Sequence, residues 1–215
     1  MLKQIVSGFL SGLMICVGGS VYLACADKYV GAFLFSIALL TVCIFKLNLF
    51  TGKVGFLTFN HTKKDFADAI FGLIGNLLGC LVFGLIISVT FENLSQLSNT
   101  MCNIKLQQPL WKALVKGFFC GVIMYVAVAS YKNSNTIVGI LIGIPVFILS
   151  GFEHSIADMS YFFIARIFNL RMALFLILVV IGNSIGSVFF SLLHKFIQAE
   201  KDNKKVEQTE GAKNE

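Results

Sequence analysis

The chain has 215 residues, of which 57% are hydrophobic and 13% charged, and its mean hydropathy is +0.84. A soluble domain presents a charged surface to water, so this composition excludes an ordinary soluble fold and indicates an integral membrane protein. The formal net charge is +6. In residues 195–215, five lysines and five acidic residues are interspersed, which predicts a solvated polar tail without fixed structure rather than a nucleic-acid ligand.

Six apolar runs precede that tail. They are residues 4–26, 29–45, 69–91, 111–131, 133–152 and 172–194. A helix needs about 20 apolar residues to cross a bilayer, so the runs predict six spans, the second of them slightly short. Six spans place both termini on one side, and the excess of lysine on that side favours the cytoplasm. We therefore expect a multi-pass protein of the cell (plasma or inner) membrane with both termini and the tail 195–215 in the cytoplasm.

Two glycine patterns recur in the same order. One, with glycines four residues apart, occurs at residues 8–12 and 117–121, and a Gly-Asn-x-x-Gly pattern occurs at residues 75–79 and 182–186. We interpret the chain as two copies of a three-span unit, about residues 3–92 and 109–194. Because each copy has an odd number of spans, the second enters the membrane inverted. Small residues four apart also let helices approach closely.

The middle span of each copy contains polar residues. Residues 47–53 include Asn48, Thr51 and Lys53, and residues 150–155 include Glu153 and His154. Irregular backbone at membrane depth is tolerated where protein encloses it or where it lines a cavity, and ionisable groups there are functional candidates. The sequence thus predicts an all-α membrane protein whose second and fifth helices are broken and meet at a substrate site.

These segments resemble the formate/nitrite transporter family. The motifs are Leu49-Phe50-Thr51-Gly52, Gly151-Phe152-Glu153-His154-Ser155-Ile156-Ala157 and the pairs Gly75-Asn76 and Gly182-Asn183. The resemblance covers about residues 3–194. It implies an aquaporin-like protomer, a six-span channel domain over residues 1–194, in a homopentamer within the lipid bilayer. Each protomer would conduct a small monovalent anion, with or without a proton, such as formate, nitrite, lactate or hydrosulfide. No cofactor or metal is expected.

The resemblance also implies roles for single residues. The family's central histidine falls on His154, and the threonine of the opposite loop falls on Thr51. Its two apolar constrictions map to Phe35 and Leu39 on the cytoplasmic side and to Leu49, Phe50 and Phe147 on the outer side. Its lysine at the start of the fourth span maps to Lys105, with Glu153 as partner. The departures from the family pattern are Gly121, where many members have an asparagine near the histidine, Asp158, which replaces an asparagine, and the added charges Lys46 and Lys53.

A bare anion at the bilayer centre is costly, and cationic groups offset part of that cost. We expect Lys105, with Lys46 or Lys53, to attract the anion past Phe147 and Leu49 to Thr51 and His154. The anion would then leave past Leu39 and Phe35. An imidazole titrates at about pH 6.5, so His154 is expected to confer pH dependence or to relay a proton.

Other interpretations stay open at this stage. Lys46 could pair with Asp158, and His154 could be a packing residue that caps the second broken helix. A neutral-solute channel or a non-conducting membrane protein of the same fold is the alternative function. An enzyme is not expected, because His154 and Ser155 are adjacent and point about 100° apart on a helix, and no Gly-x-Ser-x-Gly motif surrounds the serine.

Overall fold

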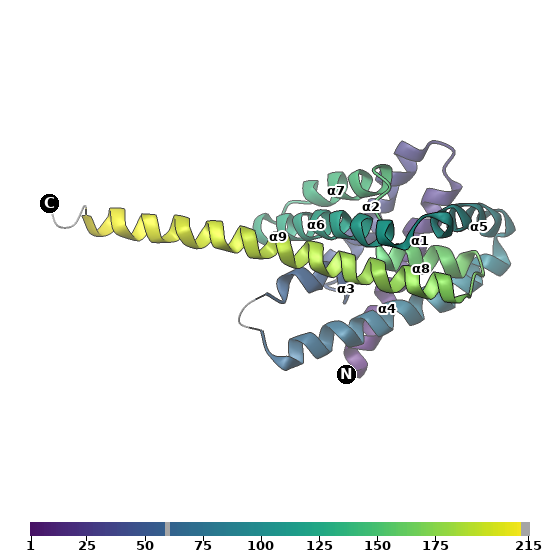
Figure 1. Ribbon diagram of the computed structural model, residues 1–215, viewed down its shortest axis with the longest axis horizontal. Helices are drawn as coiled ribbons and strands as arrows, with labels where there is room; N and C mark the ends of the chain where they lie inside the picture. The colour runs from purple at the N-terminus through teal and green to yellow at the C-terminus, as the bar shows by residue number, and fades with distance from the viewer. Residues whose placement is uncertain (59–60, 212–215) are drawn as a thin grey trace.

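The computed structural model describes residues 1–58 and 61–211, with side chains up to residue 200. This part of the chain is helical and contains no β-strand. In chain order the elements are α1 (Leu2–Ala24), α2 (Lys28–Ile44), α3 (Phe50–Lys53), the 3₁₀ turn η1 (Val54–Phe56), α4 (Lys63–Thr90), α5 (Glu92–Gln107), α6 (Leu110–Ser134), α7 (Val138–Leu149), α8 (Ser155–Ile164) and α9 (Leu170–Gly211). Figure 1 shows the helices packed into one body, from which the end of α9 projects.

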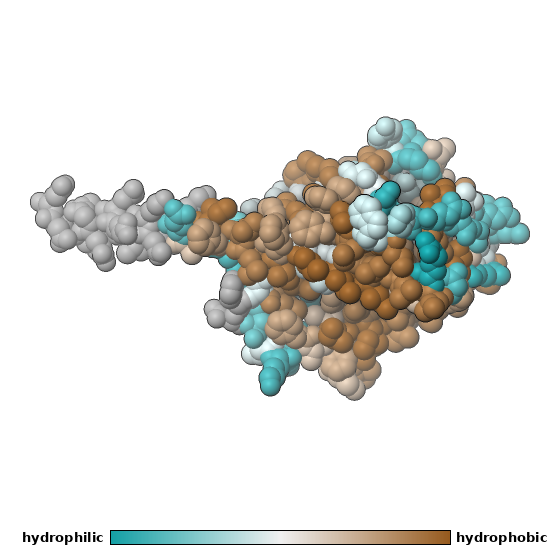
Figure 2. Space-filling model, viewed as in Figure 1, coloured by the Kyte–Doolittle hydropathy of each residue, from teal (hydrophilic) through white to brown (hydrophobic). Residues whose placement is uncertain are grey.

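Within residues 1–58 and 61–211, four helices are long and apolar enough to cross a membrane. They comprise Leu2–Ala24, Lys63–Thr90, Leu110–Ser134 and Leu170–Glu200. The apolar helices α2 and α7 are shorter. Figure 2 shows a body covered largely by apolar side chains, with polar residues gathered toward its ends. A surface of this kind faces lipid, so the prediction of an integral, all-helical membrane protein is confirmed.

Glycines bring the helices of each half into close contact. A Cβ on Gly75 of α4 would collide with the carbonyl oxygen of Ile5 on α1, and one on Gly182 of α9 would collide with that of Leu114 on α6. Larger residues would force the two backbones apart. The structure therefore confirms the close approach expected at the recurring glycine patterns.

The helices of each pair run in the same direction. In the first pair, Gly8 lies against Gly72 and Gly12 against Asn76, so the contacts advance along both helices together. The contacts between α6 and α9 advance in the same way, from Leu114 and Gly182 to Phe118 and Gly186. The C-terminal ends of α6 and α9 consequently lie at the same end of the molecule.

The chain leaves α2 and α7 through the same type of turn. Lys46 has a φ of 52° and Gly151 a φ of 68°. The next amide in each case bonds back five residues, from Leu47 N to Val42 O at 2.9 Å and from Phe152 N to Phe147 O at 3.0 Å. This is the Schellman arrangement that ends helices. Glycine adopts a positive φ without steric cost, whereas a lysine does so less readily.

The short helices after these turns cross to the opposite half. The segment after α3 reaches α9, where Thr58 Oγ1 lies 3.0 Å from Ser191 Oγ. Helix α8 lies against α4, where Cys80 Sγ is 3.5 Å from the Ile156 carbonyl oxygen. Each half thus supplies a short helix to the packing of the other half.

The polar tail differs from the prediction. We expected residues 195–215 to lack fixed structure, but α9 continues to Gly211. Lysine, glutamate, glutamine and alanine are good helix formers, so a helix already nucleated in the apolar part of α9 continues through this segment. Residues 212–215, also part of the expected tail, lie outside the described residues.

Candidate functional site

Two buried asparagines hold the breaks in place. Asn76 of α4 accepts a hydrogen bond from Phe50 N at 3.0 Å and donates to the carbonyl oxygens of Gly8 and Asn48, both at 2.9 Å. The bonds to Phe50 N and Asn48 O satisfy backbone groups at the break that have no partner within a helix, and the bond to Gly8 O ties them to α1. The first amide of α3 and the carbonyl two residues before it are thereby fixed to α4.

Asn183 of α9 makes the same three bonds in the second half. It accepts from Ser155 N at 2.9 Å and donates to the carbonyl oxygens of Gly117 at 2.8 Å and Glu153 at 2.9 Å. The segments before α3 and α8 are therefore held by equivalent contacts, which bring Thr51 and His154 together.

The centre of the site is a contact between His154 and Thr51. Their side chains are buried, and Thr51 Oγ1 lies 2.8 Å from His154 Nε2. His154 Nδ1 accepts a hydrogen bond from Ala157 N at 3.1 Å and so caps α8. An accepting nitrogen carries no hydrogen, so the neutral ring carries its hydrogen on Nε2 and donates it to Thr51. The Phe147 ring stacks on the imidazole, with centroids 5.5 Å apart.

A cavity of about 220 Å³ lies on one side of this contact. We call it the His154 cavity. It is lined by Tyr22, Phe35, Met101, Lys105, Lys116, Phe147, Ile148, Gly151, Phe152, Glu153, His154, Ala157, Asp158 and Tyr161. Its wall combines apolar rings with charged groups, an arrangement that admits a small polar solute and strips part of its water.

The charges of the His154 cavity neutralise one another. Lys105 forms an ion pair with Glu153, and its Nζ lies 2.9 Å from Asp158 Oδ1. Glu153 also accepts from Gln108 Nε2 at 3.2 Å and lies 3.8 Å from Lys116 Nζ. Lys105 belongs to α5, outside the spanning helices. Burial lowers the pKa of its ammonium, but the two carboxylates outweigh burial and hold the pKa above the ordinary value.

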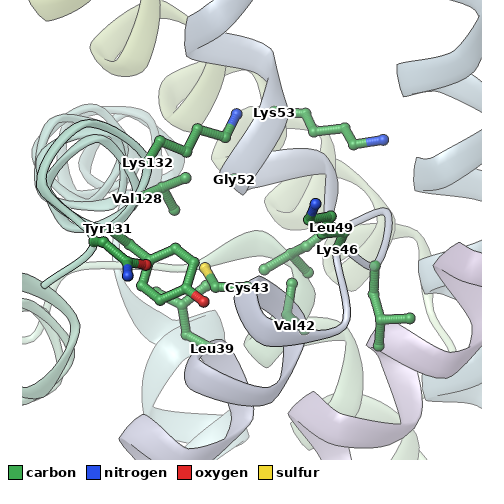
Figure 3. A pocket seen from close by; sticks show the side chains of 12 residues that line it. Leu39, Val42, Cys43, Lys46, Leu49, Gly52, Lys53, Val128, Tyr131 and Lys132 are labelled. Atoms are coloured by element: carbon green, nitrogen blue, oxygen red, sulfur yellow. The ribbon is translucent and has the colours of Figure 1, made fainter. Parts of the chain in front are cut away.

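A second cavity, of about 540 Å³, lies where α2 and α6 end (Figure 3). We call it the lysine cavity. It is lined by Leu39, Val42, Cys43, Lys46, Leu47, Leu49, Gly52, Lys53, Val128, Tyr131, Lys132 and Asn135. Thr51 lies between two of these residues in the chain and bonds to His154 in the wall of the other cavity. The Thr51–His154 contact therefore joins the walls of the two cavities.

The structure groups the apolar constriction residues differently from the prediction. Phe35 and Phe147 line the His154 cavity, whereas Leu39 and Leu49 line the lysine cavity. The resemblance instead groups Phe35 with Leu39, and Leu49 with Phe50 and Phe147. Phe50 is buried but is not among the lining residues of either cavity. From the His154 cavity to the lysine cavity, the order is the two phenylalanines, the Thr51–His154 contact and then the two leucines.

Two interpretations of the charged and small residues are wrong. Lys46 lines the lysine cavity, so it does not pair with Asp158, whose partner is Lys105. Gly121 is not the place of a missing asparagine beside His154. A Cβ there would collide with the backbone carbonyl of Asn183, so the packing of α6 on α9 requires glycine.

Sequence reasoning did not single out Lys116, Lys132 and Gln108. Lys116 and Gln108 contact Glu153, and Lys132 lines the lysine cavity. The position of Lys116 inside the fourth apolar run was a usable signal, because a charge within a span usually faces a cavity or a partner.

Comparison with known proteins agrees with this architecture. Two solved structures share the fold: a "Pentameric formate channel with formate bound" has a TM-score of 0.78 and 20% identity over 92% of this chain and 97% of that chain. An "FNT family ion channel" has a TM-score of 0.76 and 23% identity over 91% of this chain and 88% of that chain. Both are channels. At these identities the likeness shows a shared fold.

Sequence comparison identifies the family. Residues 1–197 match the profile described as "Formate/nitrite transporter", and the chain belongs to that family. The protein is accordingly a transport protein and not an enzyme, as predicted. The "Uncharacterized transporter YwcJ" of Bacillus subtilis (strain 168) is 28% identical over 145 residues, which is 61% of this chain and 57% of that relative.

Proposed function

We propose that the protein is a channel for small monovalent weak-acid anions of the formate, nitrite or hydrosulfide type. The observation that carries this proposal is the hydrogen bond between Thr51 and His154, which joins the wall of the His154 cavity to that of a second cavity lined by three lysines. A neutral-solute pore gains nothing from such groups, whereas an anion is attracted by them.

We further propose six spans arranged as two inverted three-helix repeats, with α2–α3 and α7–α8 as the broken second and fifth spans. The equivalent bonds of Asn76 and Asn183 support this arrangement. The lysine excess supports a location in the plasma or inner membrane with both termini in the cytoplasm. The pentameric state named for a solved structure of the same fold supports a homopentamer with one pore per protomer.

In this mechanism the anion loses water between Phe35 and Phe147 and meets Thr51 next. Because His154 Nε2 donates to Thr51 Oγ1, the threonine's own hydrogen is available to the anion. A weak acid lowers the remaining cost of crossing by taking up a proton, since desolvation favours its neutral form. Leu49 and Leu39 then border the exit into the lysine cavity.

His154 links this path to pH. Protonation places a hydrogen on Nδ1, which can then no longer accept the amide hydrogen of Ala157. Acidification therefore supplies a positive partner for the anion and removes the cap of α8 in the same step. The channel is expected to change its conductance when the ring titrates.

The test is uptake into liposomes containing the purified protein, with formate, nitrite, hydrosulfide and glycerol, at pH values on either side of about 6.5. His154→Asn preserves a good helix cap and does not titrate, so it should fold and lose the pH step. His154→Phe loses the cap and the bond to Thr51, so it should lower both flux and unfolding temperature.

The outcomes separate the alternatives. An identical pH profile in the parent protein and His154→Asn would exclude a titrating role for His154. Glycerol uptake faster than that of any anion would indicate a neutral-solute channel. Impermeability to every solute, equal to that of protein-free liposomes, would indicate a non-conducting protein.

A further inference from the structure

The lysine cavity is much larger than a permeant three-atom anion requires. Its volume of about 540 Å³ lies within the range of sites for metabolite-sized ligands, about 300–1,000 Å³. Leu39 and Leu49 form part of its wall beside the Thr51–His154 contact. A ligand can therefore fit in this cavity without fitting through the pore.

Three lysines contribute to the wall of this space (Figure 3). Lys46 comes from the turn after α2, Lys53 from the end of α3 and Lys132 from the last turn of α6. The Lys132 ammonium lies 3.7 Å from the centre of the Phe56 ring, which holds it at the cavity edge. Three chain segments thus converge on one site.

No aspartate or glutamate is among the described residues that line this cavity. The carboxylate that acts on Lys53 belongs to Asp68, which accepts a hydrogen bond from Gln4 at 3.0 Å. In the His154 cavity, by contrast, Glu153 and Asp158 neutralise Lys105 and Lys116. The lysine cavity therefore carries an excess of positive charge that the other cavity lacks.

Hydrogen-bonding groups accompany the charges. The side chains of Tyr131 and Asn135 lie in the same wall and can donate to oxygen. Several cations and neutral donors around a wide space match a compact anion with more than one charge and several oxygens. A monovalent three-atom ion can satisfy only part of such a set.

We propose that the lysine cavity binds a multivalent oxyanion of the phosphate class, which occupies the mouth of the pore and blocks the small permeant anion. This inference rests on the proposed channel function for its effect on flux, but not for binding. Because the cavity lies at the end of α6, and α9 runs parallel to α6, the block acts from the side of the C-terminus.

The experiment measures formate current through the purified protein in planar bilayers, with inorganic phosphate added to one side and then to the other. Gluconate, a large monovalent anion, keeps the ionic strength equal. An antibody against a C-terminal tag identifies the sides. We expect phosphate to reduce the current from the C-terminal side and gluconate to have a much smaller effect.

Variants assign the block to the cavity. A triple variant that combines Lys46→Gln, Lys53→Gln and Lys132→Gln should raise the half-blocking phosphate concentration about tenfold. This factor corresponds to the summed loss of three charge interactions, each weakened by partial exposure to solvent. Lys64→Gln is the matched control, because this exposed lysine lies in the first turn of α4 and does not line the cavity. Its block should equal that of the parent protein.

Each result has one meaning. Three results would overturn the inference. Phosphate could block equally from both sides, gluconate could block as strongly as phosphate, or phosphate could block the triple variant as strongly as the parent protein. Currents without any phosphate block would overturn it while leaving the channel function intact. If no current flows, the proposed function fails, and calorimetric titration of the parent protein and the triple variant with phosphate then decides the inference by binding alone.

Discussion

At the scale of single residues, the two ring nitrogens of His154 make two different contacts. His154 Nδ1 holds the first turn of α8, and Nε2 donates to Thr51 on the opposite break. The packing interpretation and the functional interpretation of His154 are therefore compatible. Its place as cap fixes the ring so that Nε2 points at Thr51, and the stacked Phe147 ring limits rotation.

Lys105 gives a prediction at this scale. Lys105→Met leaves the buried carboxylates of Glu153 and Asp158 facing each other, so it should destabilise the protein by about 3–5 kcal/mol. Adding Asp158→Asn removes one of these charges and should restore part of the stability. Thermal unfolding of the parent protein, both single variants and the double variant in detergent measures the coupling.

Asp158→Asn alone is the control, because the amide oxygen still accepts from Lys105 and Glu153 still neutralises the ammonium. It should lie within about 1 kcal/mol of the parent protein. Equal loss of stability in Lys105→Met and in the double variant would contradict the idea that repulsion between the carboxylates causes the loss.

The sequence predicted part of this site. Polar residues inside apolar runs indicated a functional site, and among them were His154 and Thr51. In the structure these two side chains are in contact. The side on which each apolar residue lies could not be predicted. Phe35 and Leu39 are four residues apart and lie one turn above the other on the same face of α2. Phe35 and Leu39 line different cavities because the contact between Thr51 and His154 separates the two cavities beside α2.

At the scale of elements, the glycine patterns predicted helix contacts. Glycines four residues apart lie on one face of a helix, and the absence of side chains there lets a second helix backbone approach closely. The breaks were also predictable from polar residues within apolar runs. The turn at Lys46 was not, because lysine gives no sequence signal for a positive φ. Nor does sequence show that each short helix packs on the opposite half, since that depends on contacts far apart in the chain.

The two asparagine anchors yield the prediction at this scale. Asn76→Leu and Asn183→Leu each leave the first amide of a short helix and the carbonyl two residues before it without their asparagine partner. Each variant should lose about 2–4 kcal/mol, or about 5–10 °C in unfolding temperature. Because the anchors are equivalent, the two losses should be similar.

Asn103→Leu is the matched control. Asn103 is exposed on α5 and bonds only across one helical turn to Asn99 among the contacts described. Its unfolding temperature should stay close to that of the parent protein. A large loss in only one of the two anchor variants would show that the halves are not held by equivalent contacts.

At the scale of the whole molecule, the repeated backbone supports an asymmetric charge pattern. Both halves use the same anchors and turns, yet the His154 cavity pairs its lysines with carboxylates and the lysine cavity does not. The glycine patterns indicated the close contacts of α1 with α4 and of α6 with α9. The charge asymmetry was not visible in the sequence, because it depends on which lysines share a cavity with which acids.

This asymmetry predicts rectification when the same permeant anion is present on both sides. The lysine cavity concentrates anions at its mouth, so current carried by anions entering from the C-terminal side should exceed the opposite current by about twofold or more at low salt. The Debye length falls from about 30 Å at 0.01 M to about 3 Å at 1 M, so the ratio should approach unity as salt rises. Current–voltage curves at several concentrations of formate, without multivalent anions, measure this ratio.

The combined Lys46→Gln, Lys53→Gln and Lys132→Gln variant should rectify less, whereas Lys64→Gln should not differ from the parent protein. Rectification that persists unchanged at high salt would point to the shape of the pore, and not to these charges, as its cause.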